Sequence, residues 1–189
     1  LIQLLAESGV EVSKLSPNKY SFKAKELNEN FLASQEYLLR CRSLRGSIML
    51  TGPLLARLGR AVIPQPGGDK IGRRKLDTHF LGMRKLGAEL HYNDQTGACE
   101  IVADKLAGTY ILLDEASVTG TANVVMAAVL AEGKTTIYNA ACEPYVQQLC
   151  KMLVRMGAKI DGIGSNLLHI EGVKELKGTE HTILPDMIE

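Results

Sequence analysis

Residues 149–160, LCKMLVRMGAKI, carry the pattern from which we predict the fold of this chain. Apolar residues at helical spacing lead up to Gly157, and alternating apolar and polar residues follow it. Glycine readily takes the left-handed backbone conformation in which many helices end. The segment therefore predicts a helix, a glycine C-cap and then a strand.

The same pattern occurs at residues 1–12, LIQLLAESGVEV, and at residues 80–90, FLGMRKLGAEL, with Gly9 and Gly87 in the place of Gly157. Turn residues and a further strand pattern follow, so each copy predicts a helix and a β-hairpin. The copies are about 70 to 80 residues apart. Solenoid repeats are shorter, roughly 20 to 50 residues, so we expect a compact domain.

A second kind of helix alternates with these segments. SIMLTGPLLARLG (47–59) and TANVVMAAVLAEG (121–133) are rich in small residues, and each precedes a short strand pattern, RAVIP or KTTIYNA. Small residues suit buried helices that pack closely. The predicted fold class is α/β (α+β), a pseudo-repeated domain in which helices cover sheet faces. The sequence has no GxGxxG or Walker motif of the usual nucleotide folds.

Composition excludes several classes of protein. The 189 residues carry 22 Lys and Arg against 21 Asp and Glu, a formal charge of +1, so a broad nucleic-acid or membrane surface is not expected. No apolar run approaches the roughly 20 residues that span a bilayer. The four cysteines and four histidines lack metal-binding spacing, which predicts free thiols and no metal site. We expect His169 to be half-buried in a strand.

Two loops are candidate binding sites. PQPGGDKIGRRKLDTH (64–79) contains Gly67 and Gly68 and a group of basic side chains, and it predicts a receptor for a small anion; the alternative is a solvated surface loop. LDEASVTGTANVV (113–125) leads from a strand into a helix that we expect to start near Thr121. Helix amides with the hydroxyls of Ser117, Thr119 and Thr121 suit a diphosphate; the alternative is an ordinary threonine N-cap.

Motifs along essentially the whole chain carry a resemblance. They are RGSIMLTGPLLARLGRAVIPQPGGDKIGRRKLDTHFLGMRKLGAEL, SVTGT, VLAEGKTTIYNAACEPY, MGAKIDGIGS and LPDMIE. In this order they resemble the bacterial UDP-N-acetylglucosamine 1-carboxyvinyltransferase family of enolpyruvyl transferases. The resemblance implies transfer of the enolpyruvyl group of phosphoenolpyruvate to the 3-hydroxyl of UDP-N-acetylglucosamine, with phosphate release. This reaction begins peptidoglycan synthesis, in the bacterial cytoplasm, and we expect no cofactor.

The resemblance also implies an architecture. Members of the family have two similar inside-out α/β domains, each built from three βαβαββ-like units, with the active site between the domains. Residues 1–189 resemble most of the first domain, as a single domain. The family's second domain, with its catalytic aspartate, would lie outside this chain, as would a Lys-Asn pair before Leu1. We therefore expect no turnover by residues 1–189 alone.

The family's functional positions transfer to this sequence one residue at a time. The resemblance implies that two arginines bind phosphoenolpyruvate, that the SVT segment holds the diphosphate and uridine, that two residues anchor the first loop, and that one acidic residue lies at the cleft. In that order these are Arg45 and Arg74; Ser117, Val118 and Thr119; Asp77 and His79; and Asp186.

Two positions depart from the family. Asp69 stands where most members have the cysteine that the epoxide fosfomycin alkylates, so we expect fosfomycin resistance. A carboxyl group has a reference pKa of about 3.9 against about 8.5 for a thiol, so Asp69 would serve as a general acid only when loop closure and the anionic substrate favour its neutral form. Glu115 stands where many relatives have lysine, which reverses a charge near the nucleotide.

Two other functions remain open. A 5-enolpyruvylshikimate-3-phosphate synthase would share the fold and the donor, although PGGDKIG and SVTGT resemble the UDP-sugar family more closely. A non-catalytic UDP-sugar-binding paralogue is the third possibility, against which the presence of Arg45, Asp69 and Arg74 argues.

Overall fold

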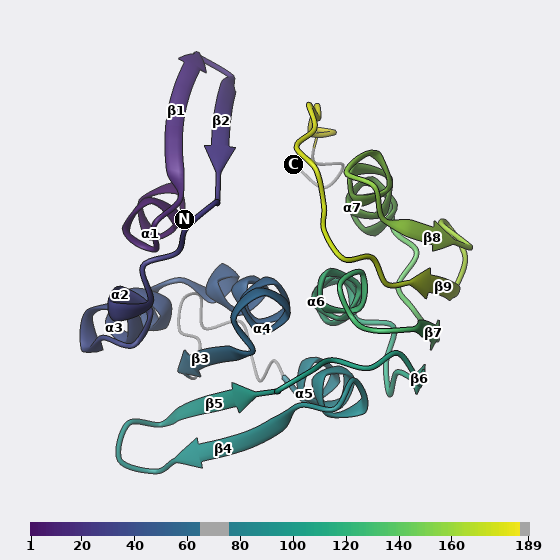
Figure 1. Cartoon of the computed structure of the whole chain (residues 1–189), viewed down its shortest axis with the longest axis horizontal. Coiled ribbons are helices and arrows are strands. Elements are labelled where there is room, and N and C mark those ends of the chain that lie inside the picture. The colour runs from purple at the N-terminus through teal and green to yellow at the C-terminus, as the bar shows by residue number, and fades with distance from the viewer. Residues whose placement is uncertain (65–75, 186–189) are drawn as a thin grey trace. The chain divides into compact units, whose positions relative to one another are not determined.

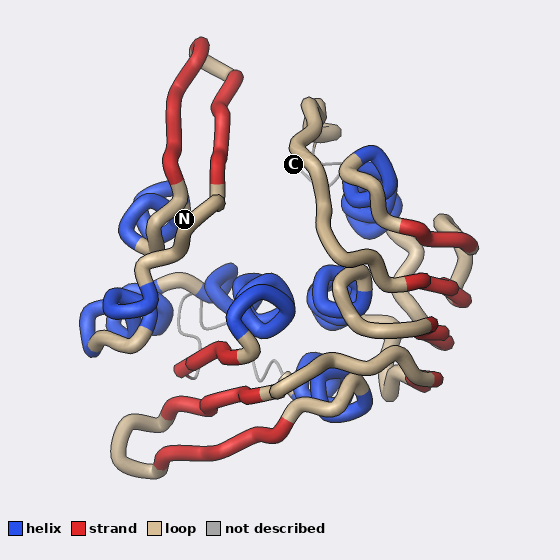
Figure 2. The backbone as a smooth tube through the Cα atoms, in the orientation of Figure 1, coloured by secondary structure: helices blue, strands red, loops and turns tan. Residues whose placement is uncertain are grey.

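The computed structural model describes residues 1–64 and 76–185 of the chain (Figure 1; Figure 2). These fall into two compact units, residues 1–48, 62–64 and 92–100, and residues 49–61, 76–91 and 101–185. In chain order the elements are α1 (Ile2–Glu7), β1 (Glu11–Ser16), β2 (Lys19–Lys23), α2 (Glu29–Leu32), α3 (Gln35–Ser43), the 3₁₀ helix η1 (Arg45–Leu50), α4 (Thr51–Leu58), β3 (Arg60–Pro64), α5 (Asp77–Lys85), β4 (Glu89–Asn93), β5 (Ala98–Val102), β6 (Tyr110–Leu112), α6 (Val118–Ala128), β7 (Lys134–Tyr138), α7 (Pro144–Arg155), β8 (Lys159–Asp161) and β9 (Leu167–Glu171). The assignment of residues 1–189 to a single domain stays a prediction.

The three predicted copies of helix, glycine and hairpin are confirmed. Gly9, Gly87 and Gly157 follow α1, α5 and α7 with φ of 95°, 98° and 104°. In the third copy the amide of Gly157 donates to the carbonyl of Val154 over 2.9 Å, and the amide of Ala158 donates to that of Leu153 over 3.0 Å. The first and second copies have the equivalent pair of bonds. This is the Schellman arrangement, which satisfies carbonyls that the helix end leaves without partners.

A further hydrogen bond recurs in all three copies and closes each hairpin onto its helix. The residue just before each glycine offers its carbonyl to an amide on the chain that leaves the hairpin. The pairs are Ser8 with Asn28 (2.9 Å), Leu86 with Ala107 (2.9 Å) and Met156 with Lys177 (2.7 Å). The chain therefore returns to the same point of the helix end in each copy, which shows that the copies are structural repeats.

One repeat is complete in the second unit. The elements β6, α6, β7, α7, β8 and β9 give the predicted βαβαββ order, and their sheet has the strand order β6-β7-β9-β8. β6 and β7 are parallel, whereas β9 is antiparallel to both β7 and β8. α6 and α7 pack against this sheet (Figure 1). The strands β3-β5-β4 have the same relative order as β7-β9-β8, as expected of a second repeat.

The helices of the second unit pack with very short distances between their backbones. α6 contacts α4, α5 and α7, and eight of its eleven residues are buried. A Cβ atom added to Gly52 of α4 would lie 2.3 Å from the carbonyl oxygen of Asn123, and one added to Gly82 of α5 would lie 2.1 Å from Cγ2 of Val124. The prediction that small residues allow these helices to approach closely is confirmed.

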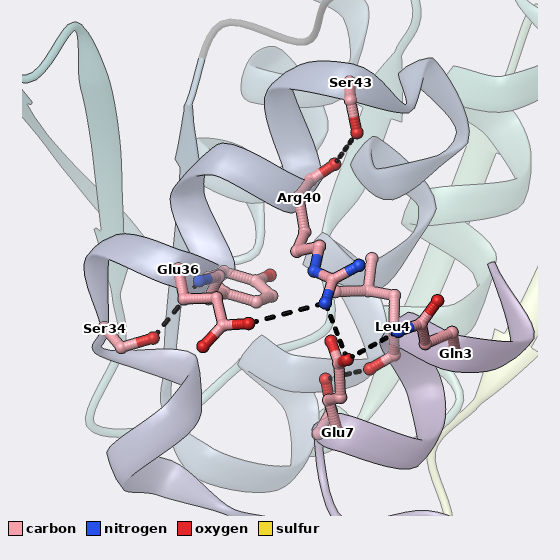
Figure 3. Close-up of polar contacts among 9 residues, drawn as sticks. Gln3, Leu4, Glu7, Ser34, Glu36, Arg40 and Ser43 are labelled. Carbon is pink, nitrogen blue, oxygen red and sulfur yellow. Dashed lines mark hydrogen bonds and ion pairs between the residues drawn. The ribbon is translucent and has the colours of Figure 1, made fainter.

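In the first unit an arginine joins two helices. Figure 3 shows Arg40 of α3 between Glu7 of α1 and Glu36 of its own helix. Its Nη2 atom lies 2.9 Å from Oε1 of Glu7 and 3.4 Å from Oε1 of Glu36. Ser34 caps α3 by accepting from the amide of Tyr37 over 3.1 Å. The contact between Arg40 and Glu7 joins α1 to α3, and Tyr37 of α3 is fully buried.

The remaining sequence predictions concern single residues. Cys41, Cys99, Cys142 and Cys150 all have free thiols. Pro144 is the first residue of α7, as the CEPY motif predicts. His169 lies in β9 as expected, but it is exposed rather than half-buried, because its side chain is on the outer face of the sheet. In the described part of the chain no helix has the length and apolar character needed to cross a membrane.

Candidate functional site

The SVTGT segment forms the start of α6. Ser117 is the N-cap residue, and its Oγ accepts from the amide of Gly120 over 3.2 Å. The helix therefore begins at Val118, and the expectation of a start near Thr121 with a threonine cap is wrong. A serine hydroxyl three residues before an amide is well placed to cap it, and this local bond extends the helix toward the loop.

Thr121 does not contribute a hydroxyl to this surface. Its side chain is fully buried, and its Oγ1 accepts from the amide of Ala141 over 2.9 Å. The prediction that Thr121 binds a diphosphate is therefore wrong, because the longer helix turns this residue into the core. Ser117 and Val118 are half-buried and Thr119 is exposed, so these three remain at the surface.

The first turn of α6 is suited to an anion. Among the described residues, the amides of Val118 and Thr119 have no carbonyl acceptor, because the first amides of a helix lack partners within it. They lie at the positive end of the helix dipole. An exposed helix start with two amides and the hydroxyl of Thr119 can hold phosphate oxygens.

A buried polar cluster lies directly beneath Thr119. His79 of α5 is 3% exposed, and its Nε2 lies 3.3 Å from Oγ1 of Thr119. Its Nδ1 lies 2.9 Å from Nδ2 of the fully buried Asn123. Oδ1 of Asn123 in turn accepts from the amide of Gly52 over 2.7 Å. Asn123 therefore provides α4 with the capping bond that its own N-cap residue, Leu50, does not provide.

A second contact joins α5 to the loop before α6. Oγ1 of Thr78 donates to Oδ1 of Asp114 over 2.7 Å. Asn123, Thr78 and Asp114 were not predicted as site residues from the sequence. The spacing of Thr119 and Asn123, four residues apart on one helix face, is the signal that would have pointed to Asn123.

The structure brings together only part of the predicted set. His79 contacts Thr119, and Ser117 and Val118 directly precede Thr119 in the sequence. Asp77 is the first residue of α5 and is exposed. Arg45 is the half-buried first residue of η1 and belongs to the other unit. Asp69, Arg74 and Asp186 lie outside the described residues. Glu115 is exposed, and its carbonyl accepts from the amide of Ser117 over 2.9 Å.

Metal-binding side chains are not grouped in this region. Across residues 1–64 and 76–185, no three or more His, Cys, Asp or Glu side chains are placed to hold an ion together. The start of α6 itself offers hydrogen-bond donors and the positive end of a helix dipole.

Comparison with a family model identifies the fold. Residues 1–189 match the model described as EPSP synthase (3-phosphoshikimate 1-carboxyvinyltransferase). The chain belongs to the EPSP synthase family. Solved structures of EPSP synthase folds agree at low sequence identity. The enolpyruvyl transferase NikO from Streptomyces tendae has a TM-score of 0.70 at 18% identity, covering 93% of this chain and 40% of its own.

The EPSP synthase from Acinetobacter baumannii has a TM-score of 0.69 at 19% identity, covering 94% of this chain and 39% of its own. These two likenesses confirm the predicted enolpyruvyl transferase-like fold and do not bear on the substrate.

Relatives with much higher sequence identity have a different name. The UDP-N-acetylglucosamine 1-carboxyvinyltransferases of Bacteroides thetaiotaomicron and Bacteroides fragilis are 65% and 66% identical over the whole chain. That of Porphyromonas gingivalis is 59% identical, also over the whole chain. The resemblance stated from the sequence is thereby confirmed. The chain spans 44% of the length of each of these relatives.

Proposed function

We propose that this chain is part of an enzyme that transfers the enolpyruvyl group of phosphoenolpyruvate to the 3-hydroxyl of UDP-N-acetylglucosamine and releases phosphate. The observation that carries the proposal is 59–66% identity over all 189 residues to relatives named for this reaction. The fold alone is shared with an EPSP synthase and does not separate the two acceptors. The reaction would belong to peptidoglycan synthesis in the bacterial cytoplasm.

The start of α6 supports the nucleotide half of the proposal. The amides of Val118 and Thr119 and the hydroxyl of Thr119 present hydrogen-bond donors at an exposed helix end. In this assignment they hold the diphosphate of the UDP-sugar. Glu115 is exposed two residues before the cap, and we expect its negative charge to weaken nucleotide binding compared with a lysine.

Phosphoenolpyruvate is assigned to two arginines. Guanidinium groups bind phosphate and carboxylate through paired hydrogen bonds, so Arg45 and Arg74 are suited to the two anionic groups of this substrate. Asp77 and His79 are assigned to anchoring the segment that carries Arg74, and Asp186 to the acidic side of the cleft. The rest of the active site is assigned to the second domain that the longer relatives have.

Asp69 is assigned the role of a general acid that protonates the donor. The proposal requires its neutral form, which burial beside an anionic substrate favours. The test is Asp69→Asn in the whole protein, which has nearly the same shape and no acidic proton. A large loss of rate is expected, and an unchanged catalytic rate would exclude an acid role.

The reaction itself is tested by phosphate release from the whole protein that contains this chain. Phosphoenolpyruvate is supplied with either UDP-N-acetylglucosamine or shikimate 3-phosphate. Release with the UDP-sugar alone is expected. Release with shikimate 3-phosphate would transfer the assignment to EPSP synthase, and UDP-sugar binding without release would indicate a non-catalytic paralogue.

A further inference from the structure

In the polar cluster beneath Thr119, the amide of Gly52 determines which atoms donate and which accept hydrogen bonds. The amide of Gly52 can only donate, and the atom of Asn123 that faces it at 2.7 Å must therefore be the acceptor Oδ1. This contact assigns the oxygen and the nitrogen of the Asn123 side-chain amide, which can otherwise be interchanged by a flip of the group. Nδ2 of Asn123, which can only donate, consequently faces Nδ1 of His79 at 2.9 Å.

The orientation of Asn123 decides where His79 carries its proton. Nδ1 faces a donor, so it must be the unprotonated acceptor nitrogen of a neutral imidazole. Nε2 then carries the hydrogen and donates to Oγ1 of Thr119, 3.3 Å away. A proton on Nδ1 would place two donors face to face in a site where Asn123 is fully buried and His79 is 3% exposed.

We propose that Asn123, acting through His79, holds the hydroxyl of Thr119 as a hydrogen-bond donor directed at a phosphate oxygen bound at the start of α6. Oγ1 of Thr119 accepts from His79, so its own hydrogen is available to the ligand. Thr119 is exposed and lies in the first turn of the helix, beside the amides assigned to the diphosphate. This inference rests on the proposed function for the identity of the ligand, and it makes Asn123 and His79 positioning residues.

Burial of the cluster holds the hydroxyl of Thr119 in the role of a hydrogen-bond donor to the ligand. A hydroxyl in water rotates freely between donor and acceptor roles, which weakens its preference for an anion. Here Oγ1 of Thr119 already accepts from Nε2 of His79, a side chain that is buried from solvent. A preorganised donor avoids part of the ordering cost of binding.

The tautomer of His79 is measured first, because it does not depend on any ligand. Nitrogen-15 NMR of the whole protein distinguishes a protonated Nε2 from a protonated Nδ1, and His79→Phe assigns the resonance. We expect an unprotonated Nδ1 and a protonated Nε2. A protonated Nδ1, as the neutral tautomer or as the imidazolium, would overturn the inference even if the enzyme proves fully active.

Binding of UDP-N-acetylglucosamine to the whole protein is measured second, by calorimetry. Thr119→Val removes the hydroxyl and retains the shape, and we expect Kd to rise about 10- to 100-fold, as for the loss of a hydrogen bond to a charged group. Thr119→Ser is the matched control and should bind nearly as the wild type does. Equal affinity of Thr119→Val and the wild type would overturn the inference.

A double-mutant cycle separates positioning from a general structural effect. Asn123→Leu should raise Kd in the wild type but not further in Thr119→Val, because both substitutions remove the same donated bond. Additive effects would indicate that Asn123 only stabilises the helices, and would overturn the inference. Asn123→Asp is a second variant should Asn123→Leu not fold; its carboxylate only accepts, so NMR should show a proton on Nδ1 of His79.

The proposed function can fail separately. If the wild-type protein binds no UDP-N-acetylglucosamine, the ligand assigned to Thr119 is wrong along with the proposed function. The NMR result still decides whether Asn123 sets the proton of His79.

Discussion

The amide of Gly52 donates to Oδ1 of Asn123 over 2.7 Å, at a point where α4 and α6 nearly touch. The amide of Gly52 is one of the helix-start amides that lack a partner within α4, and any residue except proline would supply it. Glycine is needed here because its missing side chain allows the backbone of Asn123 to approach. One buried asparagine thus caps a neighbouring helix and orients a histidine.

Gly52→Ala should destabilise the second unit. The added Cβ would lie 2.3 Å from the carbonyl oxygen of Asn123, which is backbone and cannot rotate away. We expect a loss of about 2–3 kcal/mol, in the upper part of the range for overpacked cores. Urea unfolding measures it, with Gly178→Ala as the control because nothing lies within 4 Å of that position. Similar losses in the two variants would contradict the role of Gly52.

Gly157→Ala tests the helix ends of the repeat. Its φ of 104° is unfavourable for a residue with a Cβ, although nothing lies within 4 Å of the added atom. The expected loss of about 1–2 kcal/mol is therefore conformational rather than steric. Gly157→Asn should lose less, because asparagine tolerates positive φ better. Thermal unfolding that ranks asparagine below alanine would refute this account.

Ser117 separates stability from ligand binding. Ser117→Ala removes the cap of α6, and we expect it to reduce the free energy of unfolding by about 1 kcal/mol. Ser117→Asp retains a capping oxygen and should preserve stability, but its charge repels a diphosphate. Calorimetry with UDP-N-acetylglucosamine should show weaker binding by the aspartate variant. Unchanged affinity would argue that the diphosphate does not bind at this helix end.

The thiols should differ sharply in reactivity. Cys142 is exposed, whereas Cys41, Cys99 and Cys150 are buried. Burial also raises the pKa of the Cys41 thiol, which reduces its thiolate fraction. We expect a maleimide reagent to modify Cys142 rapidly in the native chain and the other three only after unfolding. Mass spectrometry with peptide mapping identifies the modified residue, and early labelling of a buried thiol would contradict the packing.

Cys150 should make stability depend on alkaline pH. Burial raises the pKa of its thiol from 9.0 to about 11. The unfolded thiol thus ionises first, so the stabilising contribution is complete below pH 9 and is lost as the pH rises through 11. Urea unfolding across this window should show a smaller decline for Cys150→Ala than for the wild type. Identical declines would show that Cys150 is not the group responsible.

Asp69 predicts resistance to fosfomycin. A carboxylate is a much poorer nucleophile toward the epoxide than the cysteine thiolate that the family resemblance implies for this position. Intact-mass spectrometry of the whole protein should find no adduct, whereas Asp69→Cys should acquire one and lose activity. Stoichiometric labelling of Asp69 at ordinary drug concentrations would be the opposite result.

The local parts of the fold follow from the sequence. Apolar spacing and the position of Gly157 predict α7, its C-cap and β8, because helix periodicity and left-handed glycine act within a few residues. The same reasoning holds for Gly9 and Gly87. At the site, the sequence identified Ser117, Val118 and Thr119 as a surface segment, although it placed the helix start three residues too late.

Contacts between residues far apart in the sequence could not be predicted before the fold was known. Gly52 and Asn123 are 71 positions apart, and Thr121 meets an amide 20 positions away. The turns of the chain and its apolar helix and strand faces could be predicted from the sequence, since these depend on neighbouring residues. The direction of the hydrogen bonds beneath Thr119 depends on which donors three packed helices bring together, and no local pattern encodes that.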